Sequence, residues 1–342
     1  MTTVFNSSAV IASSGIAFGT SGARGLVVDF TPEVCAAFTH AFVAVMQREF
    51  AFTHMALAID NRPSSLGMAQ ACAAALHQAG IEPLYYGVVP TPALAYKAMQ
   101  DTMPCIMITG SHIPFDRNGI KFYGMSGEIS KSDENHISAA VVHLPDDDLV
   151  TDLPGVNPGA RQCYIDRYLR FFPENCLAGM KLGFYEHSSV ARDLLRDILE
   201  RLGASVISLG RTNEFVPIDT EAVSEADAQR ARDWAGLYGF DAIISTDGDA
   251  DRPLVGDEFG QWLRGDVAGI LSAQCLGAQA VATTVSCNTA VELCGAFGQV
   301  IRTRIGSPYV IEAMEAQVKA DGRKIVGFEP NGGFLVGSSF EK

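Results

Sequence analysis

The sequence predicts an α/β protein made of three consecutive units. Short apolar runs, typical of buried strands, alternate with segments of helical periodicity along almost the whole chain. This alternation favours largely parallel sheets covered by helices. The chain has 342 residues, of which 48% are hydrophobic and 19% are charged. It can therefore bury several packed cores.

The first unit, which we place at residues 1–150, has a β-α-β-α-β order. Thr31-Pro32-Glu33 has the pattern of an N-cap, a first-position proline and a first-turn acid, so a helix should begin there. Glycine and proline then separate the following segments. Strands are expected at 55–59, 81–89 and 105–108, with helices at 64–80 and 93–100.

A change of composition at 145–160, rich in Asp, Pro and Gly, predicts a linker. The second unit is placed at 151–258 and the third at 259–342. The second should contain strands at 181–186, 205–209 and 240–245, with helices at 190–202 and 220–238. The third should contain helices at 266–276, 288–296 and 307–320, with strands at 280–285, 299–304 and 324–328. The recurrence indicates structural repetition without a sequence repeat.

The bulk composition excludes some classes of function. The formal net charge is −14, and an acidic protein repels nucleic-acid backbones. The eight cysteines include no CxxC pair, which is typical of free thiols in a reducing compartment. No apolar run approaches the ~20 residues of a membrane span, and the first residues lack a cationic signal segment. We expect a cytoplasmic protein that binds neither nucleic acid nor membrane.

Three aspartates, Asp247, Asp249 and Asp251, follow a strand-like apolar run. We call them the acidic triplet. Like charges so close repel one another, and a hard divalent cation held by oxygen ligands relieves the repulsion. A solvated acidic turn is the alternative. An EF-hand is excluded, because Arg252 stands where its loop needs glycine, although Glu258 would fall at its twelfth position. Three carboxylates leave open positions, which suits Mg²⁺ and phosphoryl chemistry.

The stretch TGSHIPFDRNGIKFYG, residues 109–124, follows the apolar run 105–108 and is predicted to be a tight loop. Ser111 is a weak nucleophile unless a base or a metal activates it. Beside Mg²⁺ it could carry a phosphoryl group. His112 could orient the serine, and Lys121 could bind phosphate or polarise a sugar hydroxyl. Taken alone, a Ser-His pair in a turn is more often structural.

Two further glycine-rich stretches could contact a substrate. FGTSGARG, residues 18–25, combines small hydroxyl side chains with Arg24 and suits the close approach of an anion. GFEPNGGF, residues 327–334, places Glu329 and Asn331 on a turn, where a carboxylate and an amide suit paired sugar hydroxyls. Each stretch taken alone is compatible with an ordinary turn.

Together, the four stretches resemble the α-D-phosphohexomutase family, which includes phosphomannomutases, phosphoglucomutases and phosphoglucosamine mutases. Supporting segments are AIDNRPSS at 58–65, GVVPTPAL at 87–94 and RTRIGSPYV at 302–310. The resemblance implies three consecutive similar α/β domains with mixed, mostly parallel sheets around a cleft. It also implies a fourth, C-terminal domain, which we expect to be missing from this chain.

The resemblance further implies a role for particular residues. Ser111 would be the phosphoserine and would bind Mg²⁺ together with the acidic triplet. Arg24 and Lys121 would flank the reacting hydroxyl, and His112 and Arg252 would support the transfer. The expected substrate-binding residues are Glu329, Asn331, Thr303, Gly306, Ser307 and Asn118.

The expected activity is interconversion of hexose 1-phosphate and hexose 6-phosphate through a phosphoserine enzyme and a hexose 1,6-bisphosphate. Mannose phosphate is the preferred substrate in this interpretation, with glucose phosphate and glucosamine phosphate as alternatives. A Mg²⁺-dependent phosphatase or a kinase-like transferase, and an inactive mutase-fold fragment that acts as a scaffold, are alternatives of other classes. The protein is expected to be a monomer or a weak dimer.

Overall fold

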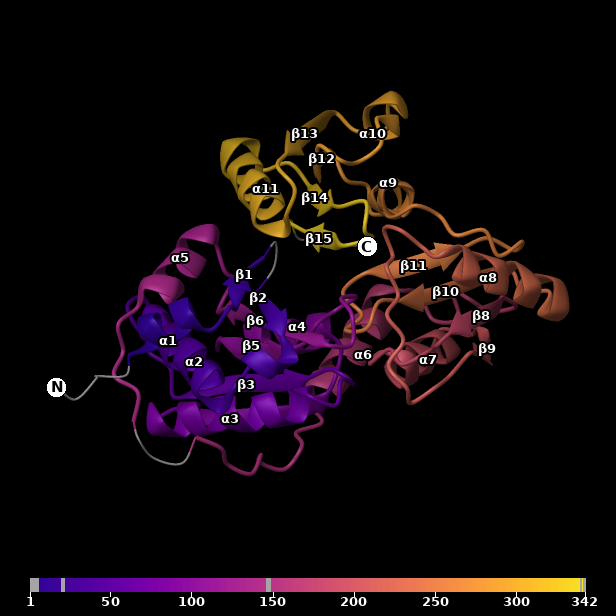
Figure 1. Ribbon diagram of the computed structural model, residues 1–342. Helices are drawn as coiled ribbons and strands as arrows, with labels where there is room; N and C mark the ends of the chain where they lie inside the picture. The colour runs from indigo at the N-terminus through magenta and orange to yellow at the C-terminus, as the bar shows by residue number, and fades with distance from the viewer. Residues whose placement is uncertain (1–5, 20–21, 146–148, 339, 341–342) are drawn as a thin grey trace. The chain divides into compact units, whose positions relative to one another are not determined.

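A computed structural model describes residues 6–19, 22–145, 149–338 and 340. The chain divides into two compact units, Met1–Asp166 and Arg167–Lys342 (Figure 1). The first unit contains one mixed sheet, and the second contains two smaller sheets. The predicted domain boundaries at 150 and 258 stay predictions. Among the described residues, no helix is both long enough and apolar enough to cross a bilayer.

The first unit is built on a seven-stranded sheet with the order β1-β2-β6-β5-β3-β4, in which β7 pairs with β6. Its strands are β1 Ala17–Phe18, β2 Ala23–Leu26, β3 His54–Ile59, β4 Glu82–Val88, β5 Cys105–Ile108, β6 Arg117–Gly124 and β7 Gly127–Glu128. Its helices are α1 Ser7–Ser13, α2 Pro32–Met46, α3 Ser65–Gln78, α4 Thr91–Gln100 and α5 Lys131–Ala139, with the short 3₁₀ helix η1 at Val27–Asp29. Helix α6, Gly159–Phe171, crosses the division between the units.

The central strands of this sheet are buried on both faces, which explains their uninterrupted apolar runs. On one face, Ile106 and Phe122 pack with side chains from α2 and α3. The rings of Phe42 and Phe122 lie 4.9 Å apart between centroids. On the other face, Ala58 and Met107 pack against α4. The two-sided core holds the carboxyl ends of β3 and β5 side by side, where both strands lead into loops.

The second unit contains two four-stranded sheets, with the orders β11-β10-β8-β9 and β13-β12-β14-β15. The elements around the first sheet are α7 Arg192–Arg201 and α8 Glu225–Tyr238, with β8 Lys181–Tyr185, β9 Ser205–Leu209, β10 Ala242–Thr246 and β11 Pro253–Gly256. The elements around the second are α9 Gly265–Cys275, α10 Ala290–Leu293 and α11 Ser307–Asp321, with β12 Ala280–Thr284, β13 Gln299–Thr303, β14 Ile325–Phe328 and β15 Phe334–Val336.

The three sheets share one topology, which supports the predicted structural repetition. Each sheet contains four consecutive strands, which begin at β3, β8 and β12. Within each set, counted in chain order, the first strand pairs in parallel with the second and with the third, and the third pairs antiparallel with the fourth. The parallel pairs are β3–β4 and β3–β5, β8–β9 and β8–β10, and β12–β13 and β12–β14. The antiparallel pairs are β5–β6, β10–β11 and β14–β15. Among the described residues, the first sheet alone continues beyond the fourth strand of its repeat, through antiparallel β2 and β1.

The connection between the third and fourth strands carries predicted site residues in all three repeats. We call these connections the serine loop (residues 109–116), the aspartate loop (247–252) and the glycine loop (329–333). Each begins at the carboxyl end of a strand that lies beside the carboxyl end of the first strand of its repeat. Such ends of parallel strands are where α/β proteins commonly place ligands.

Most predicted elements are confirmed to within a few residues, and three predictions need correction. Residues 109–124 do not form one tight loop, because 117–124 form β6, antiparallel to β5. Helix α8 begins at 225 and not at 220, because the Ser224 side chain accepts a hydrogen bond from the Asp227 amide and caps the helix there. The predicted helix at 288–296 shortens to α10, after which Gly295 has a positive φ.

Candidate functional site

The serine loop holds Ser111 in an unusual backbone conformation. Its φ is +51°, in the left-handed region, and the residue is fully buried. A serine in this region is strained by about 1 kcal/mol or more. The Ser111 amide donates to Thr109 Oγ1 at 2.8 Å, and Ser111 Oγ lies 3.2 Å from His112 Nδ1. Backbone strain at a hydroxyl beside an imidazole makes Ser111 a candidate functional residue.

Arg24 and Lys121 lie on the same face of the first sheet. Arg24 pairs in register with Gly119, and Lys121 stands two residues further along β6. Residues directly opposite one another, and residues two apart on one strand, share a face. Gly119 leaves room for the arginine, since a Cβ there would lie 3.2 Å from Arg24 Cγ. The sheet therefore brings together the two cations predicted to flank a reacting hydroxyl, and Lys121 is only 4% exposed.

Asn118, also predicted to bind substrate, is fully buried in this unit. Its Nδ2 donates to the hydroxyls of Ser64 at 2.8 Å and Ser65 at 3.0 Å, and its Oδ1 accepts from the Gly119 amide at 2.8 Å. The side chain therefore ties β6 to the start of α3. A direct contact with substrate stays a prediction for this residue.

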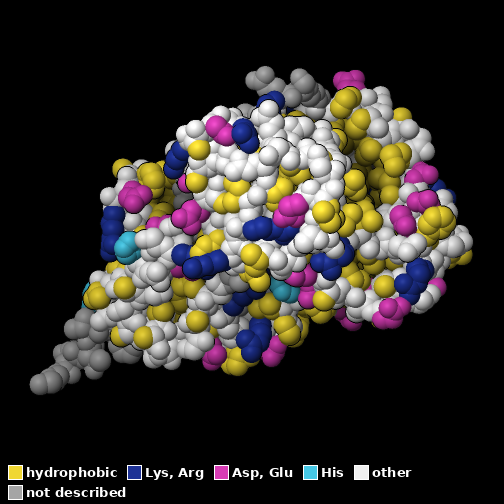
Figure 2. Space-filling view, turned by 90° about the horizontal axis from the view of Figure 1, so that it is seen from above, with side chains coloured by type: hydrophobic (Ala, Val, Ile, Leu, Met, Phe, Trp, Pro, Cys, Tyr) yellow, Lys and Arg dark blue, Asp and Glu magenta, His cyan; other side chains and the backbone are white. Residues whose placement is uncertain are grey.

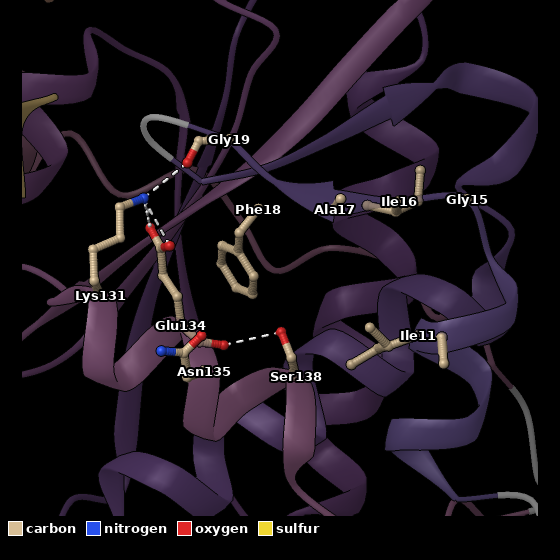
Figure 3. A pocket seen from close by; sticks show the side chains of 11 residues that line it. Ile11, Gly15, Ile16, Ala17, Phe18, Gly19, Lys131, Glu134, Asn135 and Ser138 are labelled. Atoms are coloured by element: carbon tan, nitrogen blue, oxygen red, sulfur yellow. Dashed lines mark hydrogen bonds and ion pairs between the residues drawn. The ribbon is translucent and has the colours of Figure 1, made fainter. Parts of the chain in front are cut away.

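Phe18 and Gly19, at the start of the stretch 18–25, line a hollow of about 490 Å³ (Figure 3). Lys131 Nζ, from α5, donates to the Gly19 carbonyl at 2.8 Å and pairs with Glu134 at 2.8 Å. The Gly19 amide donates to the Gly22 carbonyl at 2.9 Å. Thr20 and Ser21, whose hydroxyls were predicted to approach an anion, lie outside the described residues.

The acidic triplet forms a group that could hold a divalent cation. One carboxylate oxygen from each aspartate lies within 4.8 Å of those of the other two. Asp247 and Asp249 are fully buried, and the side chain of Asp251 is 28% exposed. Hard oxygen donors in this number suit a cation that keeps open positions for other ligands. The predicted convergence of the three side chains is confirmed.

A tight turn produces this convergence. Ala250 has a φ of +58°, and its amide donates to the Asp247 carbonyl at 3.3 Å. The Arg252 amide donates to Asp247 Oδ1 at 3.3 Å. Burial alone lowers the pKa of the Arg252 guanidinium, but the acidic triplet and Glu329 outweigh burial and raise its pKa above the ordinary value. Arg252 therefore stays charged beside the carboxylates.

A buried polar loop after β8 supports the aspartate loop, and sequence reasoning missed it. His187 Nε2 lies 2.9 Å from the Thr246 carbonyl, and Ser189 Oγ lies 2.7 Å from Thr246 Oγ1. The Val190 amide donates to the Gly248 carbonyl at 3.1 Å. Burial lowers the pKa of His187 to about 4, so the ring is neutral near pH 7. The run Glu-His-Ser-Ser directly after a strand was the available signal.

The glycine loop lies beside the aspartate loop in the second unit. A Cβ at Gly332, which has a φ of +95°, would lie 2.5 Å from the Pro253 carbonyl oxygen. The Glu329 amide donates to the Gly333 carbonyl at 3.0 Å, and Asn331 Oδ1 accepts from the Gly333 amide at 2.8 Å. The structure therefore brings the predicted sugar-binding turn next to the residues that follow Arg252.

The turn at 303–307 connects β13 to α11. Thr303 Oγ1 donates to the Arg304 carbonyl at 2.8 Å. Gly306 precedes the helix with a φ of +124°, which glycine adopts without strain, and Ser307 begins it. Amides at a helix N-terminus favour anionic groups. A contact between these residues and substrate stays a prediction.

Basic and acidic side chains are interspersed on the face of the molecule shown in Figure 2, where Lys and Arg lie among Asp and Glu.

Comparisons with known proteins identify the family. Residues 15–145 match the family model "Phosphoglucomutase/phosphomannomutase, alpha/beta/alpha domain I", and residues 264–341 match that of domain III. A curated protein named phosphomannomutase from Salmonella muenchen is 56% identical over 99% of this chain and 70% of its own length. One of the same name from Sinorhizobium fredii is 44% identical over 95% of this chain and 70% of its own length.

A solved structure has the same fold. The phosphoglucomutase/phosphomannomutase family protein from Burkholderia thailandensis superimposes with a TM-score of 0.76 at 20% identity, over 95% of this chain and 72% of that one. The sequence identities cover nearly the whole chain, and the matched regions contain the serine loop and the glycine loop. The chain therefore belongs to the phosphoglucomutase/phosphomannomutase family of α/β proteins.

Proposed function

We propose that this protein is a phosphohexomutase that interconverts the 1- and 6-phosphates of a hexose, with mannose phosphate as its preferred substrate. The observation that carries the proposal is topological. A buried, strained serine, an acidic triplet that could hold a cation, and a turn with Glu329 and Asn331 occupy the same connection in three successive repeats. The relatives at 56% and 44% identity, both named phosphomannomutase, support the choice of sugar.

The reaction is two phosphoryl transfers without net loss of the group to water. In the first, the bond between phosphorus and Ser111 Oγ breaks, and a bond forms to the free hydroxyl oxygen of the hexose phosphate. The hydroxyl proton is carried by way of Lys121 to the departing Ser111 Oγ, and Arg24, on the same face of the sheet, supplies a permanent positive charge. In the second, the other phosphoryl group of the bisphosphate moves to Ser111 Oγ, and the proton returns to the sugar oxygen left behind.

Other residues of the chain bind and orient the reactants. His112 Nδ1, 3.2 Å from Ser111 Oγ, orients the serine. Asp247, Asp249 and Asp251 would hold Mg²⁺ together with the phosphoserine, and the ion would supply positive charge that offsets the charge of the phosphoryl group. Glu329 and Asn331 bind the sugar hydroxyls, and the Thr303–Ser307 turn selects the orientation of the sugar.

Intact-mass spectrometry tests the proposal. Incubation with glucose 1,6-bisphosphate should add about 80 Da, the mass of one phosphoryl group, and peptide mapping should place it on Ser111. Ser111→Ala should abolish the gain, whereas Ser132→Ala, at an exposed serine of α5, should keep it. Rapid loss of the group to water would indicate a phosphatase, and no uptake at all would indicate a scaffold. Either result contradicts the proposal.

A coupled assay decides the substrate. Mannose 1-phosphate, glucose 1-phosphate and glucosamine 1-phosphate are compared side by side as substrates of the protein. The highest kcat/KM is expected for mannose 1-phosphate. A preference for either of the other sugars would overturn the assignment of the sugar but not that of the reaction.

A further inference from the structure

A buried arginine at the end of β3 binds the backbone of the serine loop. The Arg62 side chain is 1% exposed. Its Nη1 donates to the carbonyls of Pro114 at 2.8 Å and Arg117 at 3.0 Å. Its Nη2 donates to the carbonyls of Ser111 at 3.1 Å and Ile113 at 2.6 Å. All four acceptors lie within seven consecutive residues (111–117), so one side chain determines the path of the loop.

Asp60 holds this guanidinium in place. Its Oδ2 lies 3.3 Å from Arg62 Nε and also accepts from the Gly110 amide at 3.2 Å. Its Oδ1 accepts from the Arg62 amide at 2.9 Å and from Ser65 Oγ at 2.6 Å. A buried charge needs both a partner and saturated hydrogen bonds. Asp60 supplies the partner, and its remaining acceptor capacity links β3, α3 and the serine loop.

Gly110 allows the guanidinium to lie against the loop. A Cβ at this position would lie 2.5 Å from Arg62 Nε and 2.6 Å from Cζ, distances that real contacts do not allow. The φ of Gly110 is outside the left-handed region, so alanine could adopt its backbone conformation. Alanine at 110 would therefore displace the arginine without imposing backbone strain of its own.

We propose that Arg62, held by Asp60, is a positioning residue that presents Ser111 for phosphoryl transfer. This inference rests on the proposed function. Ser111 has a strained φ of +51°, and a strained residue persists only where its surroundings over-determine it. Four donations from one planar, rigid group provide that constraint. Lysine has a compact ammonium with three donors and cannot reproduce the fork.

Kinetics of the variants test the proposal. Arg62→Lys should lower kcat, and the rate of phosphoryl uptake from glucose 1,6-bisphosphate, by about 100-fold, since misplacement of a reacting group by about 1 Å has an effect of that size. The KM should change by less than about threefold, because Arg62 touches the loop and not the sugar. Gly110→Ala should produce the same pattern by displacing the guanidinium.

A double variant and a control separate positioning from general damage. In the double variant Arg62→Ala/Gly110→Ala, the methyl group added at 110 occupies space that the Arg62 side chain has left. The decrease in kcat should therefore equal that of Arg62→Ala alone. Arg201→Lys is the control. Arg201 pairs with Asp197 at 2.7 Å on the exposed side of α7, outside the serine, aspartate and glycine loops. Its replacement should leave phosphoryl uptake within about twofold of wild type.

Three results would overturn the proposal. The first is phosphoryl uptake by Arg62→Lys at the wild-type rate. The second is a loss of kcat in the double variant equal to the product of the losses in the two single variants. The third is loss of the native circular dichroism spectrum in both Arg62→Lys and Gly110→Ala, which would show that Arg62 stabilises the fold. Hydrogen exchange of the amides at 110–117 gives a readout that needs no chemistry, and Arg62→Lys should accelerate it about tenfold or more. If the wild-type protein takes up no phosphoryl group, the proposed function fails. If Arg62→Lys leaves the exchange of these amides as slow as in wild type, the positioning role is rejected independently of the function.

Discussion

Replacing Asp249 with asparagine should stabilise the metal-free protein and abolish its stabilisation by Mg²⁺. The carboxylate oxygens of the acidic triplet lie within 4.8 Å of one another, and Asp249 is fully buried. At an effective dielectric constant of about 20, two unit charges 4.8 Å apart repel by about 3.5 kcal/mol. Asp249 takes part in two such pairs, and Arg252 offsets part of the repulsion. We therefore expect Asp249→Asn to gain about 1 to 3 kcal/mol without metal.

Differential scanning fluorimetry with EDTA and with Mg²⁺ measures this effect. In EDTA the variant should melt about 2 to 10 °C above wild type. With Mg²⁺ at about 100 times its Kd, the free energy of unfolding of wild type should rise by about 2.7 kcal/mol and that of the variant by almost nothing. The difference between the two melting temperatures should therefore narrow or change sign.

Glu258→Gln is the matched control, because it removes one exposed carboxylate a few residues away. Its stability should stay within about 0.5 kcal/mol of wild type in both buffers. The reasoning would be refuted if Asp249→Asn melted below wild type in EDTA, or if Mg²⁺ stabilised the variant as strongly as wild type.

Three further predictions concern the first unit. Gly119→Ala places a Cβ 2.8 Å from the Ala23 carbonyl oxygen and 3.2 Å from Arg24 Cγ. This overpacking should lower the free energy of unfolding by about 1 to 3 kcal/mol and should also lower kcat. Normal turnover in a coupled assay would contradict this prediction. Phe122→Ala removes a side chain that is 1% exposed and packed against three other phenylalanines. Urea unfolding should show a decrease of about 3 to 5 kcal/mol in the free energy of unfolding. A decrease below about 1 kcal/mol would contradict this packing. Burial lowers the pKa of His40 below its ordinary 6.5 despite a hydrogen bond to Gln78, so the unfolded chain takes up the proton first. Stability should therefore fall as the pH drops below 6.5, by at most about 1.4 kcal/mol per pH unit, and His40→Gln should flatten the dependence of the unfolding midpoint on pH.

Local patterns in the sequence determined the elements and the residues that carry chemistry. Thr31 caps α2 as its neighbours indicate, and its hydroxyl accepts from the Val34 amide. The runs at 105–108 and 280–284 are buried strands: the first is apolar throughout, and the second adds two β-branched threonines to an apolar start. The spacing of the acidic triplet predicted its convergence, since the backbone between these residues is too short to separate them. Signals of this kind act within a few residues, and the sequence displays them directly.

Only the tertiary structure decided which distant groups meet. The sequence does not show that 117–124 returns as a strand, so it could not place Arg24 and Lys121 on one face of a sheet. It offered AIDNRPSS as a motif but not the reason for Arg62, whose hydrogen-bond acceptors lie 49 to 55 residues away. It also concealed the common strand order that assigns the serine, aspartate and glycine loops to one position in three repeats. These relations arise from strand pairing and burial across long separations, where many sequences satisfy the same packing and no local pattern records the partner.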